Sequence, residues 1–319
     1  MADMICREEI TETLRKDSVP DRKIDQCIRL LEENGFMEGI SSFYVINKGM
    51  TNKLFYFKAE GKEYLIRVPG EGTEYLLDRT QEAAVYRELA DENITDKIVC
   101  IDPVEGFKIT EYIAGVHNCN VADAEEVRRC MLHLKALHDK EIKTEKEFDP
   151  FEMLEHYECS CRHDISDFVP EYSARRKEIN ELREIINRLP RRSVLCHVDP
   201  VYDNFLVRDG EVHLIDWEYA AQADPDMDIA MFCIYAGYDK EEIDRVTDMY
   251  YPEGRDERHR IKIYGYIACS ALLWVVWCEI KRDSGVLFDE YEKQQYEYVH
   301  KFYELAKNGF LLLNKQTQE

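Results

Sequence analysis

The stretch CHVDPVYDNFLV, residues 196–207, is the most informative part of the sequence. It places His197, Asp199 and Asn204 on one short segment, with the asparagine five residues after the aspartate. An aspartate in this position can accept the proton of an attacking hydroxyl, and the asparagine can bind Mg²⁺. The two groups have to act on the same phosphate within a few ångström, so the chemistry needs both on one loop.

A second stretch, VHLIDWEY at residues 212–219, supplies another carboxylate. Its apolar strand ends in Asp216, twelve residues past Asn204, and the turn at Gly210 predicts a hairpin between them. A strand that ends in an aspartate is typical of the second Mg²⁺ ligand of an ATP site. Short motifs also arise by chance, and Asp216 alone could be a surface acid. Both stretches together, in this order behind a β-rich segment, predict a kinase-like site.

From residue 41 to the stretch at 196–207, the chain begins with a β-rich segment and continues with a largely helical one. Five short β-prone runs are separated by turns, at 43–46, 54–57, 64–68, 98–101 and 107–113. A helix is expected at 80–90, between the third and the fourth run. After Asp123, helical patterns dominate to the end of the chain, apart from a strand-and-turn region at 194–219.

This order predicts an α+β, bilobal, protein-kinase-like fold with a small antiparallel-sheet N-lobe and a larger, mostly helical C-lobe. The expected boundaries are 1–40 for a helical N-terminal extension, 41–114 for a nucleotide-binding N-lobe and 115–319 for a catalytic and substrate-binding C-lobe, with a cleft at 113–120. In the extension, Ile24, Ile28 and Leu31 share one helical face, and no chemistry is assigned to it.

The N-lobe should handle the phosphates. The segment KGMTN, residues 48–52, has a glycine turn that lets backbone N–H groups approach a nucleotide. Arg67 ends the third strand, where protein kinases hold a phosphate-pairing lysine, and Glu82 on the next helix is its natural partner. The alternative for Arg67 and Glu82 is a pair of unrelated surface charges.

At this point the sequence resembles the choline/ethanolamine kinases, a branch of the aminoglycoside-phosphotransferase-like kinases, and it looks closest to the bacterial choline kinases. The resemblance covers roughly residues 40–310 and is carried by these motifs: GMTN followed by LF (49–55), YLIRVPG (64–70), GTE (72–74), Glu82, HVDPVYDNFLV (197–207), LIDWEYA (214–220) and DMDIAMF (226–232). An arginine at the third-strand position is the habit of this family.

The resemblance implies a role for each matched residue. Asp199 would be the catalytic base, while Asn204 and Asp216 would hold Mg²⁺. Thr51 and Asn52 would lie over the phosphates of ATP. Arg67, with Glu82 as its partner, would contact the same phosphates. The backbone of a hinge at Glu111 to Ile113 would bind the adenine. Asp228 would brace the catalytic loop, and His197 would be a structural hydrogen-bonding residue.

Two tryptophans bear on the acceptor. Trp274 and Trp277 project from one face of an expected buried helix over 264–278, and aromatic cages with tryptophan recognise quaternary ammonium groups. Choline kinases carry the same W-x-x-W pair. Tyr219, Tyr235 and Tyr291 are candidates to complete the cage, and Glu218 is a candidate carboxylate for the cation. Aromatic residues at this spacing are more often ordinary core, so that alternative stays open.

The prediction is therefore a Mg-ATP-dependent phosphotransferase that acts on choline. A kinase for ethanolamine, an aminoglycoside or another amino-alcohol would keep the same catalytic residues. An inactive pseudokinase that binds nucleotide is the alternative of a different class, and the intact Asp199, Asn204 and Asp216 argue against it. A protein kinase is disfavoured because the sequence has no GxGxxG before the strand pair, no DFG and no APE.

The charge and hydropathy of the chain indicate which binding partners and which cellular location to expect. The net charge is −23, from 65 acidic and 42 basic residues, which disfavours nucleic acid and anionic membranes and favours a small cationic substrate. The chain starts without an apolar signal segment, and its most apolar stretch is shorter than a membrane span. We expect a cytoplasmic protein without membrane insertion, and the oligomeric state stays open.

Eleven cysteines, an odd number, are expected to be mostly free and buried. One group, His156, Cys159, Cys161 and His163, invites a metal-site hypothesis. Its spacing does not match the usual zinc patterns, so coincidence is favoured, and zinc analysis of the protein would decide.

Overall fold

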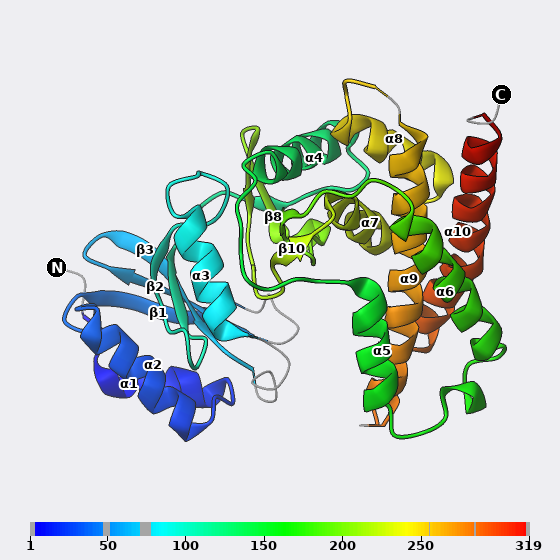
Figure 1. Cartoon of the computed structure of the whole chain (residues 1–319). Coiled ribbons are helices and arrows are strands. Elements are labelled where there is room, and N and C mark those ends of the chain that lie inside the picture. The colour runs from blue at the N-terminus through cyan, green and yellow to red at the C-terminus, as the bar shows by residue number, and fades with distance from the viewer. Residues whose placement is uncertain (1–3, 47–51, 71–77, 255, 284, 317–319) are drawn as a thin grey trace. The chain divides into compact units, whose positions relative to one another are not determined.

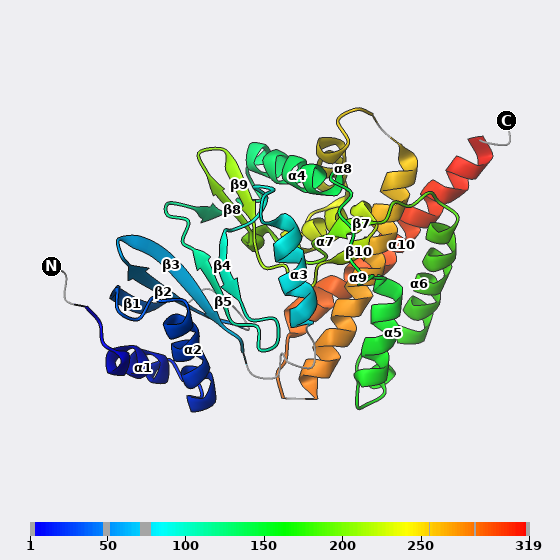
Figure 2. The same ribbon diagram turned by 60° about the vertical axis from the view of Figure 1, so that its left-hand side comes forward.

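The computed structural model of the chain describes residues 4–46, 52–70, 78–254, 256–283 and 285–316. The chain forms two compact units. Unit 1 comprises Met1–His117 and His213–Tyr219, and unit 2 comprises Asn118–Val212 and Ala220–Glu319. Figure 1 labels most elements of the two units, and Figure 2 also labels β4, β5, β7 and β9.

Unit 1 is built on a five-stranded antiparallel sheet. Its strands lie in the order β1-β2-β3-β5-β4: β1 (Ile40–Ile46), β2 (Lys53–Ala59), β3 (Lys62–Val68), β5 (Lys108–Glu111) and β4 (Ile98–Ile101). The β2–β3 turn consists of Glu60 and Gly61, with φ of 51° and 82°, a two-residue hairpin that matches the twist of the strands. All five predicted strands are present, with ends shifted by up to three residues.

The two faces of this sheet have different chemistry because side chains alternate along a strand. Ile66 and Val68 of β3 enter an apolar core shared with α1 (Arg7–Lys16) and α2 (Asp21–Glu33). Arg67, between them, points to the opposite face, where it meets α3 (Arg79–Leu89) through Glu82. In both views α1 and α2 lie together near β1 (Figures 1 and 2), and their apolar side chains pack on the face of the sheet that carries Ile66 and Val68.

The described part of the first forty residues contributes to this core. The predicted apolar face of α2 is buried, with Ile24, Ile28 and Leu31 at most 2% exposed, and the helix ends at Glu33 ahead of Gly35, whose φ of 74° suits glycine. These side chains pack in one cluster with Phe55 and Phe57 of the sheet. The segment that the sequence set apart as an extension therefore belongs to unit 1.

Residues 213–219 also belong to unit 1, whereas the sequence assigned all of 115–319 to a C-terminal lobe. The backbone N–H of Leu214 donates to the carbonyl of Ile94 over 2.9 Å. The fully buried Trp217 donates its indole N–H to Thr95 Oγ1 over 2.8 Å. These long-range contacts, which sequence order does not reveal, fix the segment that carries Asp216.

Unit 2 is mainly helical. Its helices are α4 (Ala124–His138), α5 (Pro150–Ser160), α6 (Tyr172–Asn187), α7 (Pro225–Ala236), α8 (Lys240–Tyr250), α9 (Glu257–Arg282) and α10 (Asp289–Gln316). Helix α9 packs against α5, α6, α7 and α10. Within the part of the chain that the structure describes, α9 is the one helix long and apolar enough to cross a membrane, but 83% of its apolar window is buried inside the protein. It is the core helix predicted over 264–278.

Short strands frame the catalytic stretch. β7 (Val194–Cys196) precedes it and pairs with β10 (Ala221–Ala223), which leads into α7. β8 (Phe205–Arg208) follows it and lies between β6 (His117–Asn118) and β9 (Glu211–Leu214). The β8–β9 turn has Asp209 and Gly210 at φ of 49° and 88°, so the hairpin predicted at Gly210 is confirmed.

Candidate active site

The loop of unit 2 that was predicted to be catalytic is held through its backbone. The Asp228 carboxylate, fully buried at the start of α7, accepts the N–H groups of His197 (2.7 Å) and Val198 (2.8 Å). Val198 has a φ of 72°, which is unusual for a β-branched residue and requires such outside support. The bracing contact that the resemblance implied for Asp228 is thus present in the structure.

Asp228 is itself held by a residue that the sequence analysis missed. His138, buried at the end of α4, contacts Asp228 Oδ2 with Nε2 at 3.1 Å and Tyr250 Oη with Nδ1 at 2.7 Å. An imidazole that donates from Nε2 and accepts the tyrosine O–H at Nδ1 satisfies all three groups. The sequence offered one signal for this role, a histidine within the apolar pattern of a helix. That signal was not sufficient, because the partners of His138 lie on distant elements.

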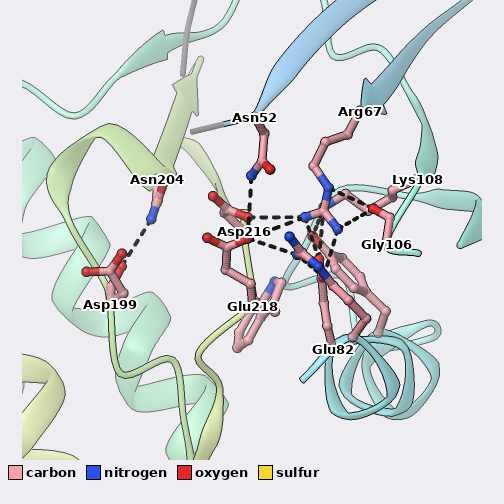
Figure 3. Close-up of polar contacts among 12 residues, drawn as sticks. Asn52, Arg67, Glu82, Gly106, Lys108, Asp199, Asn204, Asp216 and Glu218 are labelled. Carbon is pink, nitrogen blue, oxygen red and sulfur yellow. Dashed lines mark hydrogen bonds and ion pairs between the residues drawn. The ribbon is translucent and has the colours of Figure 1, made fainter. Parts of the chain in front are cut away.

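Asp199 and Asn204 lie on the loop as predicted. The side-chain nitrogen of Asn204 donates to the backbone carbonyl of Asp199 over 3.0 Å, which fixes the asparagine relative to the proposed base (Figure 3). Burial raises the pKa of Tyr157, on α5, and of Tyr291, on α10, and the negative charge of Asp199 raises both further. Both tyrosines therefore lie near Asp199, and Tyr157 was not predicted.

In unit 1, Arg67 and Glu82 form a buried bidentate ion pair, not two surface charges. Arg67 donates from its two terminal nitrogens to the two Glu82 oxygens over 2.6 and 2.7 Å, and the side chains are 3% and 0% exposed (Figure 3). Burial alone would raise the pKa of Glu82. The charges of Arg67 and Lys108 and the hydrogen bonds from Arg67 outweigh that effect and lower the pKa to about 2.

The same arginine reaches the proposed metal ligand. Arg67 approaches Asp216 Oδ1 at 3.4 Å and donates to the carbonyl of Gly106 over 2.9 Å. Asp216 has a φ of 71°, and its side chain is 35% exposed. The left-handed backbone at Asp216 and the anchoring of its neighbour Trp217 together set the direction of this carboxylate.

Arg79, which the sequence analysis did not single out, completes the charged cluster. It donates to Glu82 Oε2 over 2.9 Å and to Glu218 Oε2 over 3.0 Å while only 6% exposed. Gly106 makes room for it, since a Cβ there would lie 2.5 Å from Arg79 Nε. Glu218 was predicted to face the substrate cation, but within unit 1 its charge is taken up by Arg79, so it is left out of the cage proposed below.

The other nucleotide-site predictions lie in unit 1 as well. Asn52 donates to Glu218 Oε2 and accepts the N–H of Gly70, each over 3.4 Å. Glu111 ends β5 and pairs with Lys97 at 2.7 Å, and the half-buried Ile113 follows it. Thr51, like the predicted motifs at 48–51 and 72–74, lies outside the described residues.

The two tryptophans of α9 lie in an aromatic cluster within unit 2. Trp274 and Trp277 meet edge to face with ring centroids 6.0 Å apart. Tyr235 of α7 lies 5.7 Å from Trp274, and Phe288, which was not predicted, lies 5.1 Å from Trp277. Lys281 Nζ lies 5.2 Å from the Trp277 ring, so this indole already attracts one cation. Tyr219 belongs to unit 1, whereas the residues of this cluster belong to unit 2.

The four residues suggested as a metal site, His156, Cys159, Cys161 and His163, do not form one cluster in the structure. Cys161 and His163 lie together with Asp283, close enough to share an ion, whereas His156 and Cys159 are not part of that group among the described residues. Both ring nitrogens of His163 already contact carboxylates, Asp283 at 2.9 Å and Glu279 at 2.8 Å. This arrangement fits a protonated imidazole between two acids. All eleven cysteines are free, and seven are buried, as expected.

Comparison with known proteins identifies the family. The family model described as choline/ethanolamine kinase matches residues 43–267. Protein LicA of Haemophilus influenzae is 24% identical over 80% of this chain and 78% of its own length. Human ethanolamine kinase 2 is 25% identical over 76% of this chain and 70% of its own.

Solved structures share the fold. The choline kinase LicA from Streptococcus pneumoniae gives a TM-score of 0.73 with 24% identity, covering 88% of this chain and 99% of that one. The aminoglycoside phosphotransferase APH(4)-Ia, as a complex with ADP and hygromycin B, gives 0.63 with 15% identity, covering 87% of this chain and 97% of that one. The kinase-like α+β fold predicted from the catalytic stretch is confirmed, and the chain belongs to the choline/ethanolamine kinase family of small-molecule kinases.

Proposed function

We propose that this kinase transfers the γ-phosphoryl group of Mg-ATP to the hydroxyl of choline, giving phosphocholine. Asp199 accepts the hydroxyl proton, the choline oxygen forms a bond to the γ-phosphorus, and the bond to the leaving ADP oxygen breaks. Arg67 offers positive charge to the nucleotide phosphates, and Glu82 holds it in place over two hydrogen bonds.

Magnesium fits the residues present. Asn204 uses its side-chain nitrogen on the Asp199 carbonyl, so its side-chain oxygen is the atom remaining for a cation. Asp216 adds a partly exposed carboxylate. Oxygen donors of these two kinds are the ligands Mg²⁺ prefers, and the bound ion would neutralise charge that develops on the phosphates.

The aromatic cluster is the observation that carries the choice of acceptor. Around Trp274 and Trp277, the ring contacts that the structure describes come from Tyr235, Phe288 and the cation of Lys281. The aromatic rings among these suit a trimethylated ammonium, which has no N–H to donate and binds aromatic faces, whereas the Lys281 cation over Trp277 is not part of such a wall. A primary ammonium binds chiefly through hydrogen-bond acceptors, and the rings of Trp274, Trp277 and Phe288 offer none.

The position of the cluster supports the same acceptor. Unit 2 holds both tryptophans and Asp199, and the Asp199 charge reaches Tyr157 and Tyr291. We infer that Tyr235, Tyr291, Trp274 and Trp277 contribute to the choline site, while a contribution of Tyr219 remains a prediction. The cytoplasmic location and a cationic amino-alcohol as the partner are part of this proposal.

A methylation series tests the proposal directly. ADP release with Mg-ATP would be measured with ethanolamine, its mono- and dimethyl derivatives, choline, an aminoglycoside and no acceptor. We expect kcat/KM to rise with each methyl group and to be highest for choline. A maximum at ethanolamine would keep the kinase chemistry and remove the aromatic cage from the argument, and ATP binding without turnover on any acceptor would support an inactive nucleotide-binding protein.

A further inference from the structure

The helices α1 and α2, for which the sequence suggested no chemistry, reach the proposed nucleotide site through Lys23. This side chain is 3% exposed, although it carries a charge. Its Nζ donates to the carbonyls of Pro69 (2.9 Å) and Gly70 (3.0 Å), which follow directly after β3 and its Arg67. Burying an ammonium is unfavourable unless its hydrogen bonds are made, and here two backbone carbonyls make them.

The contact continues to Asn52. The N–H of Gly70, whose carbonyl Lys23 holds, donates to Asn52 Oδ1 over 3.4 Å. The nitrogen of the same asparagine donates to Glu218, which pairs with Arg79. Lys23 is therefore two steps from the side chain that is proposed to lie over the ATP phosphates, and every step lies within unit 1.

The helix pair makes a second contact next to Asn52, through the residue that follows it in the chain. Lys53, the next residue in the chain, donates to the backbone carbonyl of Asp17, between α1 and α2, and lies 3.7 Å from its carboxylate. The start of β2 and the end of β3 are thus both tied to the helix pair. These strands are adjacent, with Lys53 opposite Val68, so the two ties act on one end of the sheet.

We propose that Lys23 is a positioning residue for the nucleotide: it fixes the Pro69–Gly70 backbone, which in turn orients Asn52 toward ATP. This inference rests on the proposed contact between Asn52 and the nucleotide. It predicts an effect on ATP and none on the acceptor, because the chain of contacts ends at the nucleotide end of the sheet. A packing role alone would change stability and leave the KM for ATP unchanged.

The test uses the full-length enzyme with Lys23→Met, which keeps the apolar stem and removes the donors. Each lost hydrogen bond contributes about 0.5–1.5 kcal/mol, so we expect the KM for ATP to rise by about 2- to 12-fold per bond. The kcat and the KM for choline should change little, and the melting temperature should fall, because the two carbonyls lose their donor. Lys23→Arg keeps a donor for both carbonyls and should restore the KM for ATP to within about twofold of the wild type.

Matched variants make the outcome decisive. Lys16→Met removes an exposed lysine of α1, paired with Glu12 at 2.8 Å, and should leave every constant unchanged. If Lys23→Met does not fold, Lys23→Gln, whose amide still donates, replaces it, with an intermediate KM for ATP expected. An unchanged KM for ATP in a folded donor-removing variant, or an equal rise for ATP and choline, overturns the inference.

Asn52→Ala separates this inference from the proposed function. If Asn52→Ala raises the KM for ATP and Lys23→Met does not, the positioning role of Lys23 fails while the nucleotide contact stands. If Asn52→Ala has no effect, the assignment of Asn52 to ATP fails, and with it the proposed route from Lys23.

Discussion

Replacing Glu82 by glutamine should lower the free energy of unfolding by about 3 kcal/mol at pH 7. The pKa of Glu82 falls from its ordinary 4.5 to about 2 in the folded chain. At about 1.36 kcal/mol per pKa unit, this difference corresponds to about 3 kcal/mol. Removing one partner of a buried ion pair has a comparable cost of about 3–5 kcal/mol, because Arg67 would keep its charge in a site where it is 3% exposed.

The pH dependence of this effect has a definite sign. A lowered pKa in the folded state means that the stabilisation is fully present above the unfolded pKa of 4.5 and is lost as the pH falls from 4.5 toward 2. The difference between the wild type and Glu82→Gln should therefore be constant from pH 7 to about pH 5.5 and should close at lower pH.

Urea unfolding followed by far-UV circular dichroism at several pH values between 7 and 3 measures both quantities. Glu125→Gln is the matched control, because the pKa of Glu125 is also lowered to about 2, by hydrogen bonds from Arg128 and Arg129 on an exposed helix surface. Solvent screens such a pair, so this variant should change stability little. Equal losses for Glu82→Gln and Glu125→Gln would refute the reasoning that burial gives the Glu82 pair its strength.

Three further predictions concern single side chains. Asp199→Asn should abolish phosphoryl transfer in an ADP-release assay while ATP still binds, and Asp203→Asn, on the same loop, should retain activity; full turnover by Asp199→Asn would show that it is not the base. Trp274→Ala should raise the KM for choline by about 30-fold, from a cation–π contact of about 2 kcal/mol, with the KM for ATP unchanged. An equal rise in both constants would indicate a packing role. The hydrogen bonds of His163 to Asp283 and Glu279 raise its pKa above 6.5, so the stabilisation it provides is complete below pH 6.5 and lost as the pH rises through the folded pKa. The stability gap between the wild type and His163→Gln in urea should shrink at alkaline pH, and a gap that widens would contradict this sign.

The sequence predicted elements that local patterns encode. The strands of unit 1 follow from β-prone runs separated by turns, and α9 from its long apolar pattern. The loop that carries Asp199 and Asn204 was singled out because kinase chemistry requires fixed spacing between two such residues, and its catalytic role stays a prediction. The Arg67–Glu82 pair was also found, since a strand and the following helix place the two charges side by side.

Residues whose partners come from distant elements were missed. The helix pattern around His138 does not predict its contacts with Asp228 and Tyr250. Arg79 contacts Glu218 because residues 213–219 belong to unit 1, which sequence order does not reveal. For the same reason Glu218 was assigned to the substrate cation: its position beside Asp216 was visible in the sequence, while its arginine partner was not. Pair contacts of this kind depend on tertiary packing and not on local periodicity.

The insertion of residues 213–219 into unit 1 has a consequence for how the protein is made. A ribosome that adds about 5–20 residues per second needs roughly 5–20 s to proceed from residue 117 to residue 219. Throughout that interval the nascent sheet lacks the segment that brings Asp216 and Glu218 to its arginines. The end of unit 1 that is proposed to bind nucleotide can therefore be completed only after most of the chain has left the ribosome. Neither unit can be produced whole by cutting the gene at a single point.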